Sequence, residues 1–121
     1  MVLHATADGR VRLLRSVDLG RTFASSALTD AKESHGQVDL AASGPEARAI
    51  WRKGTTVYLR RSADGGATWS AREDTGVERR EDIEISPNVV LFRGETAVAW
   101  SAADPAWEDL GGSWVSITST P

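Results

Sequence analysis

One eight-residue pattern occurs twice in this chain, and it constrains the fold more than any other feature. Both copies read S-x-D-x-G-x-T-[FW], where x is any residue, and they span residues 16–23 and 62–69. Their aspartates, Asp18 and Asp64, are 46 positions apart. A repeat of about 40 to 50 residues has the size of one supersecondary unit in a repeat protein. The spacing therefore predicts a chain built from repeated antiparallel units.

Aligning the sequence on the two copies outlines a complete unit in the middle of the chain. Alternating apolar and polar residues, separated by turns that contain glycine, predict four strands there. The predicted strands span residues 37–43, 47–52, 56–62 and 68–73. Four consecutive strands joined by short turns are expected to form one antiparallel sheet.

Shorter versions of this unit flank it on both sides. In the first, the Asp8-Gly9 sequence favours a two-residue hairpin turn. Its predicted strands span residues 2–7, 11–16 and 22–27. In the third unit, predicted strands span residues 87–92, 96–100 and 113–118, and the segment 101–112 interrupts the repeat. We expect one all-β domain, residues 1–121, with units at about 1–28, 37–75 and 83–121.

The repeated pattern resembles the Asp-box, or BNR repeat, of sialidase-like β-propellers. The resemblance covers the two motifs and the strands around them. It implies β-propeller blades of four antiparallel strands, with one complete blade flanked by two partial blades. In that family the Asp-box lies on the rim of the propeller, away from the active site, and has a structural role. That role is expected for Ser16, Asp18, Gly20, Thr22 and Phe23, and for Ser62, Asp64, Gly66, Thr68 and Trp69.

The residue types of the motif explain this structural role. A carboxylate can accept hydrogen bonds from backbone amides across a turn, as in an Asx-turn. Glycine adopts a positive φ at little cost. We expect the threonine hydroxyl to close the loop from its other end, and Phe23 or Trp69 to anchor it in the apolar layer between blades.

Three blades are fewer than the four to eight that usually close a propeller. Repeats bury their faces only against neighbours, so both end faces of such a chain need a cover. Identical chains could associate, the chain could join the remainder of a longer or split propeller, or the strands could form a compact sandwich. We expect a homo-oligomer, with a dimer favoured, because closed homodimers are the commonest assembly.

Composition excludes several classes of function. The net charge of −3 and the pI of about 5.3 provide no basic surface for nucleic acid. No apolar run approaches the roughly 20 residues that span a bilayer, and the first residues do not resemble a signal peptide. The sequence therefore predicts a soluble chain without a membrane partner and leaves its compartment open. It has no cysteine, and the acid spacing after Asp64 does not fit a calcium loop, so no metal or cofactor is expected.

Comparison with the resembled family favours a non-catalytic role. Sialidases of this family bind a substrate carboxylate with three arginines, and use a tyrosine–glutamate pair and an aspartate for catalysis. They also carry an Arg-Ile-Pro-like motif, which is absent here, and Tyr58 is the only tyrosine. The main hypothesis is a module that binds a glycan or a protein. The alternatives are a fragment or subunit of a sialidase-like glycoside hydrolase, and a purely structural or engineered propeller fragment.

Two segments contain the candidate binding residues. In the interruption of the third unit, Trp107 could stack on a sugar ring while neighbouring carboxylates accept hydrogen bonds from the sugar hydroxyl groups. The favoured alternative is that Trp107 caps the blade or meets a partner chain. The acids concerned are Asp104, Glu108 and Asp109. In the charged link at residues 72–82, Arg79 or Arg80 could meet an anionic group, and the link at 29–36 is similar.

The remaining aromatic residues are expected to pack between sheets, as large aromatics usually do. They are Trp51, Tyr58, Phe92, Trp100 and Trp114. In the strand at residues 56–62, alternation predicts that Val57 and Leu59 lie on one face and Tyr58 and Arg60 on the other.

Overall fold

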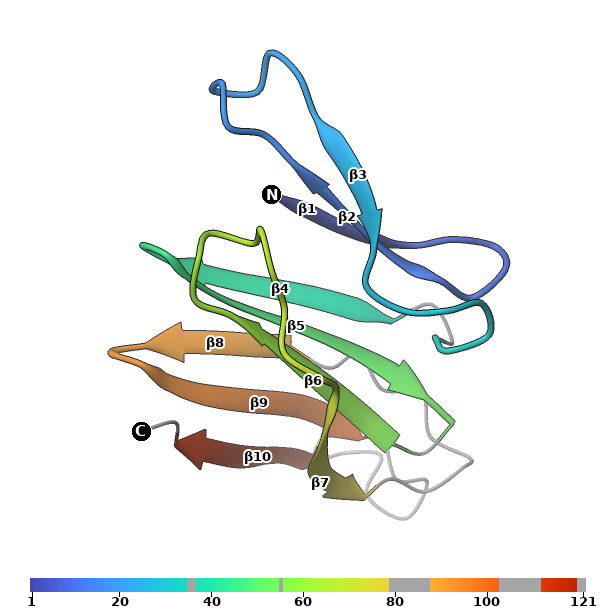
Figure 1. The fold of residues 1–121 in the computed structure, drawn as a ribbon. Coiled ribbons are helices and arrows are strands. Elements are labelled where there is room, and N and C mark those ends of the chain that lie inside the picture. Colours follow the sequence, from blue (N-terminus) through green and yellow to red (C-terminus); the bar gives the residue numbers. More distant parts are fainter. Residues whose placement is uncertain (35–36, 55, 79–87, 103–111, 120–121) are drawn as a thin grey trace.

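The computed structural model describes residues 1–34, 37–54, 56–78, 88–102 and 112–119, which contain ten strands and no helix (Figure 1). The fold is all-β, as predicted. The strands form three antiparallel sheets, none of which closes on itself within the described residues, and each sheet follows chain order.

The first sheet contains β1 (Val2–Ala5), β2 (Val11–Arg15) and β3 (Ala24–Ala27). The second contains β4 (Val38–Ser43), β5 (Glu46–Lys53), β6 (Thr56–Ser62) and β7 (Glu73–Glu78). The third contains β8 (Asn88–Phe92), β9 (Glu95–Ala102) and β10 (Gly112–Ser119).

The last strand of the second sheet is displaced from its predicted place. It was expected at residues 68–73, but β7 begins at Glu73 and occupies part of the segment expected to be a link. Near Ser70 the pairing with Arg61 is irregular, since the Ser70 amide donates to the Arg61 carbonyl (2.8 Å) while the Ser70 hydroxyl accepts from the Arg61 amide (2.9 Å). The side chain thus replaces the backbone carbonyl, and the ladder continues only where Leu59 faces Glu73.

The turn between β1 and β2 is longer than predicted. The Thr6 amide donates to the Arg10 carbonyl (2.8 Å), and the Gly9 amide donates to the Thr6 carbonyl (2.9 Å). Residues 7–9 therefore form the tip of the loop, and Gly9 has φ of +80°. Three-residue hairpin loops commonly end in a glycine of this conformation, so the glycine signal was correct and the loop length was wrong.

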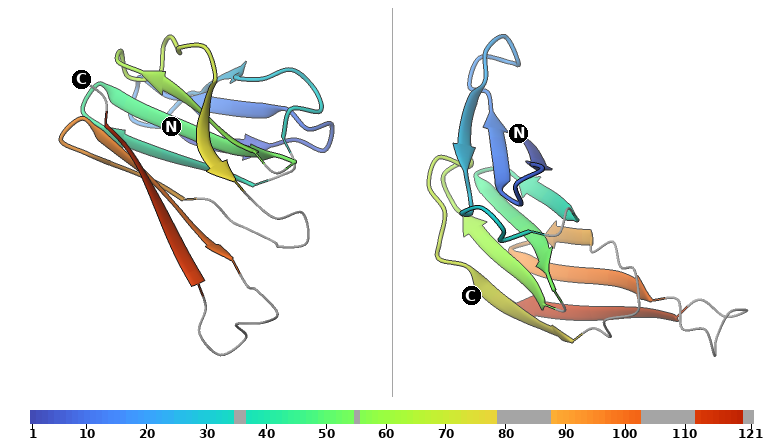
Figure 2. Two further views of the ribbon diagram at one scale, coloured as in Figure 1. Left: turned by 90° about the horizontal axis from the view of Figure 1, so that it is seen from below. Right: turned by 90° about the vertical axis from the view of Figure 1, so that its right-hand side faces the viewer.

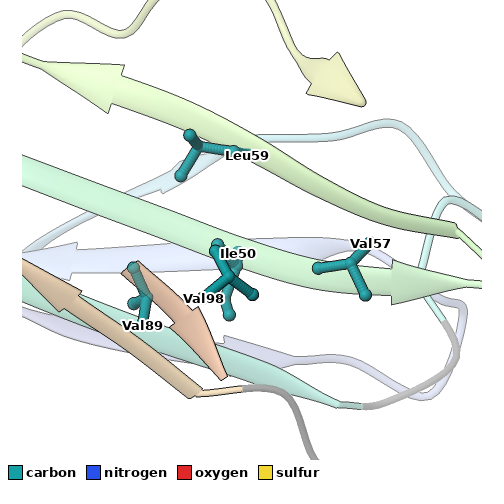
Figure 3. Packing of buried hydrophobic residues seen from close by; sticks show 5 residues of the cluster. All are labelled: Ile50, Val57, Leu59, Val89 and Val98. Carbon is teal, nitrogen blue, oxygen red and sulfur yellow. The ribbon is translucent and has the colours of Figure 1, made fainter. Parts of the chain in front are cut away.

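The three sheets follow one another face to face, from the first in blue to the third in orange and red (Figures 1 and 2). The second sheet is covered on both sides because successive residues of a strand point to opposite faces. On β5, Trp51 is buried against the first sheet, whereas Ile50 is buried against the third. Figure 3 shows Ile50, Val57 and Leu59 of the second sheet meeting Val89 and Val98 of the third. The cluster toward the first sheet comprises Val11, Leu13, Leu28, Ala49 and Trp51.

Polar side chains also join neighbouring sheets. Between the second and third, the buried Arg48 donates from Nε to the Thr96 hydroxyl (3.0 Å), and the Asp39 carboxylate accepts from the Val89 amide (2.8 Å). Between the first and second, Arg15 Nε donates to the Gly65 carbonyl (2.9 Å). These bonds fix the position of each sheet on the next, in addition to the apolar contacts.

The predicted roles of the strand aromatics have different outcomes. Trp51 is fully buried, and the half-buried Tyr58 packs beside it with ring centroids 6.0 Å apart. The predicted alternation along β6 is also confirmed, since Val57 and Leu59 face the third sheet. The prediction for Phe92 was wrong: it is 65% exposed, because it lies on the face of the third sheet that has no neighbouring sheet. The Trp100 and Trp114 side chains lie outside the described part of the structure.

Candidate functional site

The first copy of the repeated motif forms a closed loop held by its own side chains. The Asp18 carboxylate accepts from the Thr22 amide (2.8 Å) and from the Thr22 hydroxyl. The Ser16 hydroxyl donates to Asp18 (2.8 Å) and accepts from the Gly20 amide (2.8 Å), where φ is +83°. Ser16, Asp18 and Thr22 therefore all contribute to the loop, and the bonds between Asp18 and Thr22 are those expected from the sequence.

The second copy repeats this arrangement. The Asp64 carboxylate accepts from the Thr68 amide (2.9 Å) and hydroxyl, and the Ser62 hydroxyl links Asp64 to the Gly66 amide (2.9 Å). Hydrogen bonds from the Thr68 hydroxyl, the Thr68 amide and the Ser62 hydroxyl lower the pKa of Asp64 to about 2. The equivalent bonds lower the pKa of Asp18 to about 2. Both carboxylates are thus stabilised as anions, which suits a structural role and not proton transfer.

The two copies differ in what covers them. The second lies against the first sheet: a Cβ on Gly66 would meet Arg15 Cδ at 3.6 Å and Leu13 Cδ2 at 3.7 Å. Its aromatic residue, Trp69, packs onto the apolar cluster between the two sheets. At the equivalent place in the first copy, Phe23 is 52% exposed. The prediction that this aromatic anchors the loop between sheets therefore holds for Trp69 and fails for Phe23.

Apolar side chains are exposed at both ends of the stack. On the first sheet and its motif these are Val2, Val17, Leu19 and Phe23, and on the third sheet they are Val90 and Phe92. Leu19 is fully exposed and has a positive φ of 62°, which is uncommon for a residue other than glycine. Val2, Val90 and Phe92 lie on strands, whereas Val17, Leu19 and Phe23 lie on the loop of the first motif. Exposed apolar patches are typical of interaction surfaces. We refer to these two surfaces as the first open face and the third open face.

The candidate binding residues selected from the sequence lie outside the described residues. They are Asp104, Trp107, Glu108 and Asp109 in the interruption of the third unit, and Arg79 and Arg80 in the charged link. Among the residues that the structure describes, no group of three or more acidic or histidine side chains could hold a metal ion. The same residues include no helix of the length and apolarity needed to cross a membrane.

Three arginines that bond between sheets were missed by sequence reasoning, and the first of them is Arg48, described above. Arg15 reaches the Gly65 carbonyl, and Arg60 reaches the Leu28 carbonyl in the segment after β3. Strand alternation correctly placed Arg60 on the face of Tyr58, but the Leu28 carbonyl that it contacts lies 32 residues away in the sequence. The residue type alone gives no signal for such contacts.

Comparison with known proteins identifies no family for this chain. The sequence matches no protein-family model and no curated protein.

Proposed function

We propose that this chain is a non-catalytic β-propeller module of the Asp-box type, and that two identical chains associate to complete a ring that binds a glycan or protein partner. One observation carries the proposal. The first and third open faces are equivalent, by the repeat, to the two faces of the second sheet that already receive a neighbouring sheet. Each chain would therefore present two surfaces that can pack on each other in the way that its neighbouring sheets already do.

The strand registers support this equivalence for the first open face. Val2 is paired with Leu14 in the first sheet, as Ala49 is paired with Arg60 in the second. Ala49 belongs to the face that meets the first sheet, so Val2 belongs to a face of the same type. Phe23 is exposed, whereas Trp69 at the equivalent position packs against a neighbouring sheet. This difference also indicates that the first open face lacks a neighbouring sheet.

The registers support it for the third open face as well. Val90 is paired with Ala97, as Ala41 is paired with Arg48 in the second sheet. Ala41 packs on the cluster that receives the third sheet, and Arg48 donates to that sheet. The third open face of one chain is thus suited to the first open face of another, and two such contacts related by a two-fold axis close the assembly.

The native mass in solution tests the association. We expect light scattering to give twice 13.0 kDa for the unchanged chain. Phe23→Ser should shift the equilibrium toward the monomer by about tenfold or more, since burying a phenylalanine contributes about 1.5–3 kcal/mol at each of two contacts. Arg21→Ser, an exposed residue of the same loop at a variable motif position, is the matched control and should leave the mass unchanged.

A second variant separates association from folding. Leu19→Gly introduces the residue found at the equivalent position of the second motif, where Gly65 has a φ of +72°. It removes an exposed apolar side chain while suiting the local backbone, so the monomer should fold and dimerise less. A folded monomer of the unchanged chain at all concentrations would contradict the proposal. A monomer that becomes a stable complex only with a different protein would indicate a split propeller instead.

A further inference from the structure

An open cleft of about 560 Å³ lies between the first and second sheets. Its walls come from the end of β3 and the segment after it, from β5 and β6, and from the residues just before β7. They are Ala27, Leu28, Thr29, Asp30, Glu33, Trp51, Arg60, Ala71 and Arg72. The cleft exists partly because β7 begins late, which leaves Ala71 and Arg72 outside the ladder. Its volume suits a small ligand.

The most distinctive group in the cleft is the Arg60 guanidinium. It donates from Nε to the Ser70 carbonyl, from Nη1 to the Leu28 carbonyl and from Nη2 to the Trp69 carbonyl (3.3 Å). All three acceptors are neutral, and no carboxylate of the described residues pairs with this charge. Burial lowers the pKa of Arg60, in keeping with a partly desolvated cation. A guanidinium has five N–H donors, so one on each terminal nitrogen is left for a ligand.

A second cation lines the cleft. The Arg72 guanidinium lies 4.3 Å from the centroid of the Tyr58 ring and pairs with Glu33, which also pairs with Lys53 (3.0 Å). Glu33 is therefore shared between two cations and does not neutralise Arg60. The residues that line the cleft carry two cations, Arg60 and Arg72, and two carboxylates, Asp30 and Glu33. Of the two cations, Arg60 is the one without a carboxylate partner among the described residues.

A third observation concerns hydrogen-bond donors. Trp51, which lines the cleft, has a buried Nε1–H without an acceptor among the described residues. A buried donor without a partner is costly. Because this nitrogen is itself buried, the donors that the cleft offers to a ligand are those of Arg60.

We propose that this cleft binds a small hydroxylated carboxylate with the chemistry of a uronic acid. Its carboxylate would take the two free N–H groups of Arg60 in a paired arrangement, beside Arg72, and its hydroxyl groups would donate to the lining carboxylates Asp30 and Glu33. The proposal gives a ligand class to the binding role proposed above and rests on that role. It does not require two chains to associate, because one chain supplies the walls described.

D-glucuronate is the probe, and D-glucose is its uncharged control. We expect titration followed by NMR to show saturable binding of glucuronate, with a shift of the Trp51 indole N–H resonance, which Trp51→Phe identifies. Glucose should bind about tenfold more weakly or worse, because it lacks the charged hydrogen bonds. Equal binding of both sugars, or no binding of glucuronate to the folded protein, would overturn the proposal.

Three variants locate the site. Arg72→Gln and Arg60→Lys should each weaken glucuronate binding by about tenfold. Arg72→Gln removes a positive charge, and Arg60→Lys removes the planar guanidinium that can bond both carboxylate oxygens. Arg61→Gln is the matched control: it changes the neighbouring residue of β6, which pairs with Glu73, and should change affinity less than about twofold. If Arg60→Lys does not fold, Arg72→Gln still tests whether the cleft is the binding site. Equal effects of Arg72→Gln and Arg61→Gln on the affinity for glucuronate would show that it is not. Native mass measured on the same samples shows whether association succeeds or fails independently of ligand binding.

Discussion

Asp18 and Asp64 each accept hydrogen bonds at both carboxylate oxygens from residues of their own loop. This density of bonds explains why both pKa values are about 2, below the usual 3.8. Because the bonds form within eight residues, each motif stabilises its hairpin whether or not another sheet covers it. The stabilisation that each motif gives to its hairpin therefore depends on a few residues of the motif itself.

The low pKa values predict how stability depends on pH. The folded protein favours the ionised aspartates more than the unfolded chain does, so these groups stabilise the fold above about pH 4, and the contribution is lost as pH falls toward 2. Asp64→Asn should lower the free energy of unfolding at pH 7, and its difference from the unchanged protein should shrink between pH 4 and pH 2. Asp18→Asn should do the same. Urea denaturation across this range measures the effect, and parallel pH profiles for all three proteins would contradict it.

At the scale of elements, the turn between β1 and β2 is fixed by a close approach of two backbones. A Cβ on Gly9 would lie 2.8 Å from the Cα of Lys32 and 3.1 Å from the carbonyl oxygen of Ser34. The backbone amides of Lys32 and Ser34 also donate to this loop. The hairpin thus holds the segment that leads from the first sheet to the second.

Gly9→Ala tests this contact. The change should cost about 1–2 kcal/mol for the positive φ and about 1–3 kcal/mol more for the clash with backbone atoms. Gly44→Ala is the matched control, since Gly44 also has a positive φ (57°) but no atom within 4 Å of an added Cβ. Thermal and urea unfolding should show a clearly larger loss for Gly9→Ala. Equal losses would show that the contact contributes nothing.

At the scale of the whole molecule, β5 joins the two apolar clusters. Trp51 belongs to the cluster toward the first sheet and Ile50 to the cluster toward the third, and both are fully buried. If β5 separates from one cluster, its residues in the other cluster become exposed as well. The three sheets are therefore expected to unfold together.

This predicts one unfolding transition that both clusters control. Trp51→Ala should cost about 3–5 kcal/mol and Ile50→Ala about 2–5 kcal/mol, while the exposed Ser26→Ala should change stability by less than about 0.5 kcal/mol. Circular dichroism and tryptophan fluorescence, recorded at one protein concentration because association adds to apparent stability, should give coincident curves. Separate transitions for the two probes, or a loss confined to one of them, would show that the sheets unfold independently.

The sequence by itself determined the parts of this protein that depend on near neighbours. The motifs of residues 16–23 and 62–69, the grouping of strands into sheets of three, four and three, and the two faces of β6 were all predicted from residue type and spacing. Hydrogen bonds inside a short loop, and alternation along a strand, involve residues only a few positions apart. Such relations can be read directly from a sequence.

Only the tertiary structure decided which equivalent positions are covered. Phe23 and Trp69 occupy the same place in the motif, yet one is exposed and the other packs against a neighbouring sheet. The contact of Arg60 with the Leu28 carbonyl likewise forms only when the first and second sheets meet. Burial and charge pairing are properties of three-dimensional surroundings, and a repeated sequence gives its copies the same residues but different neighbours.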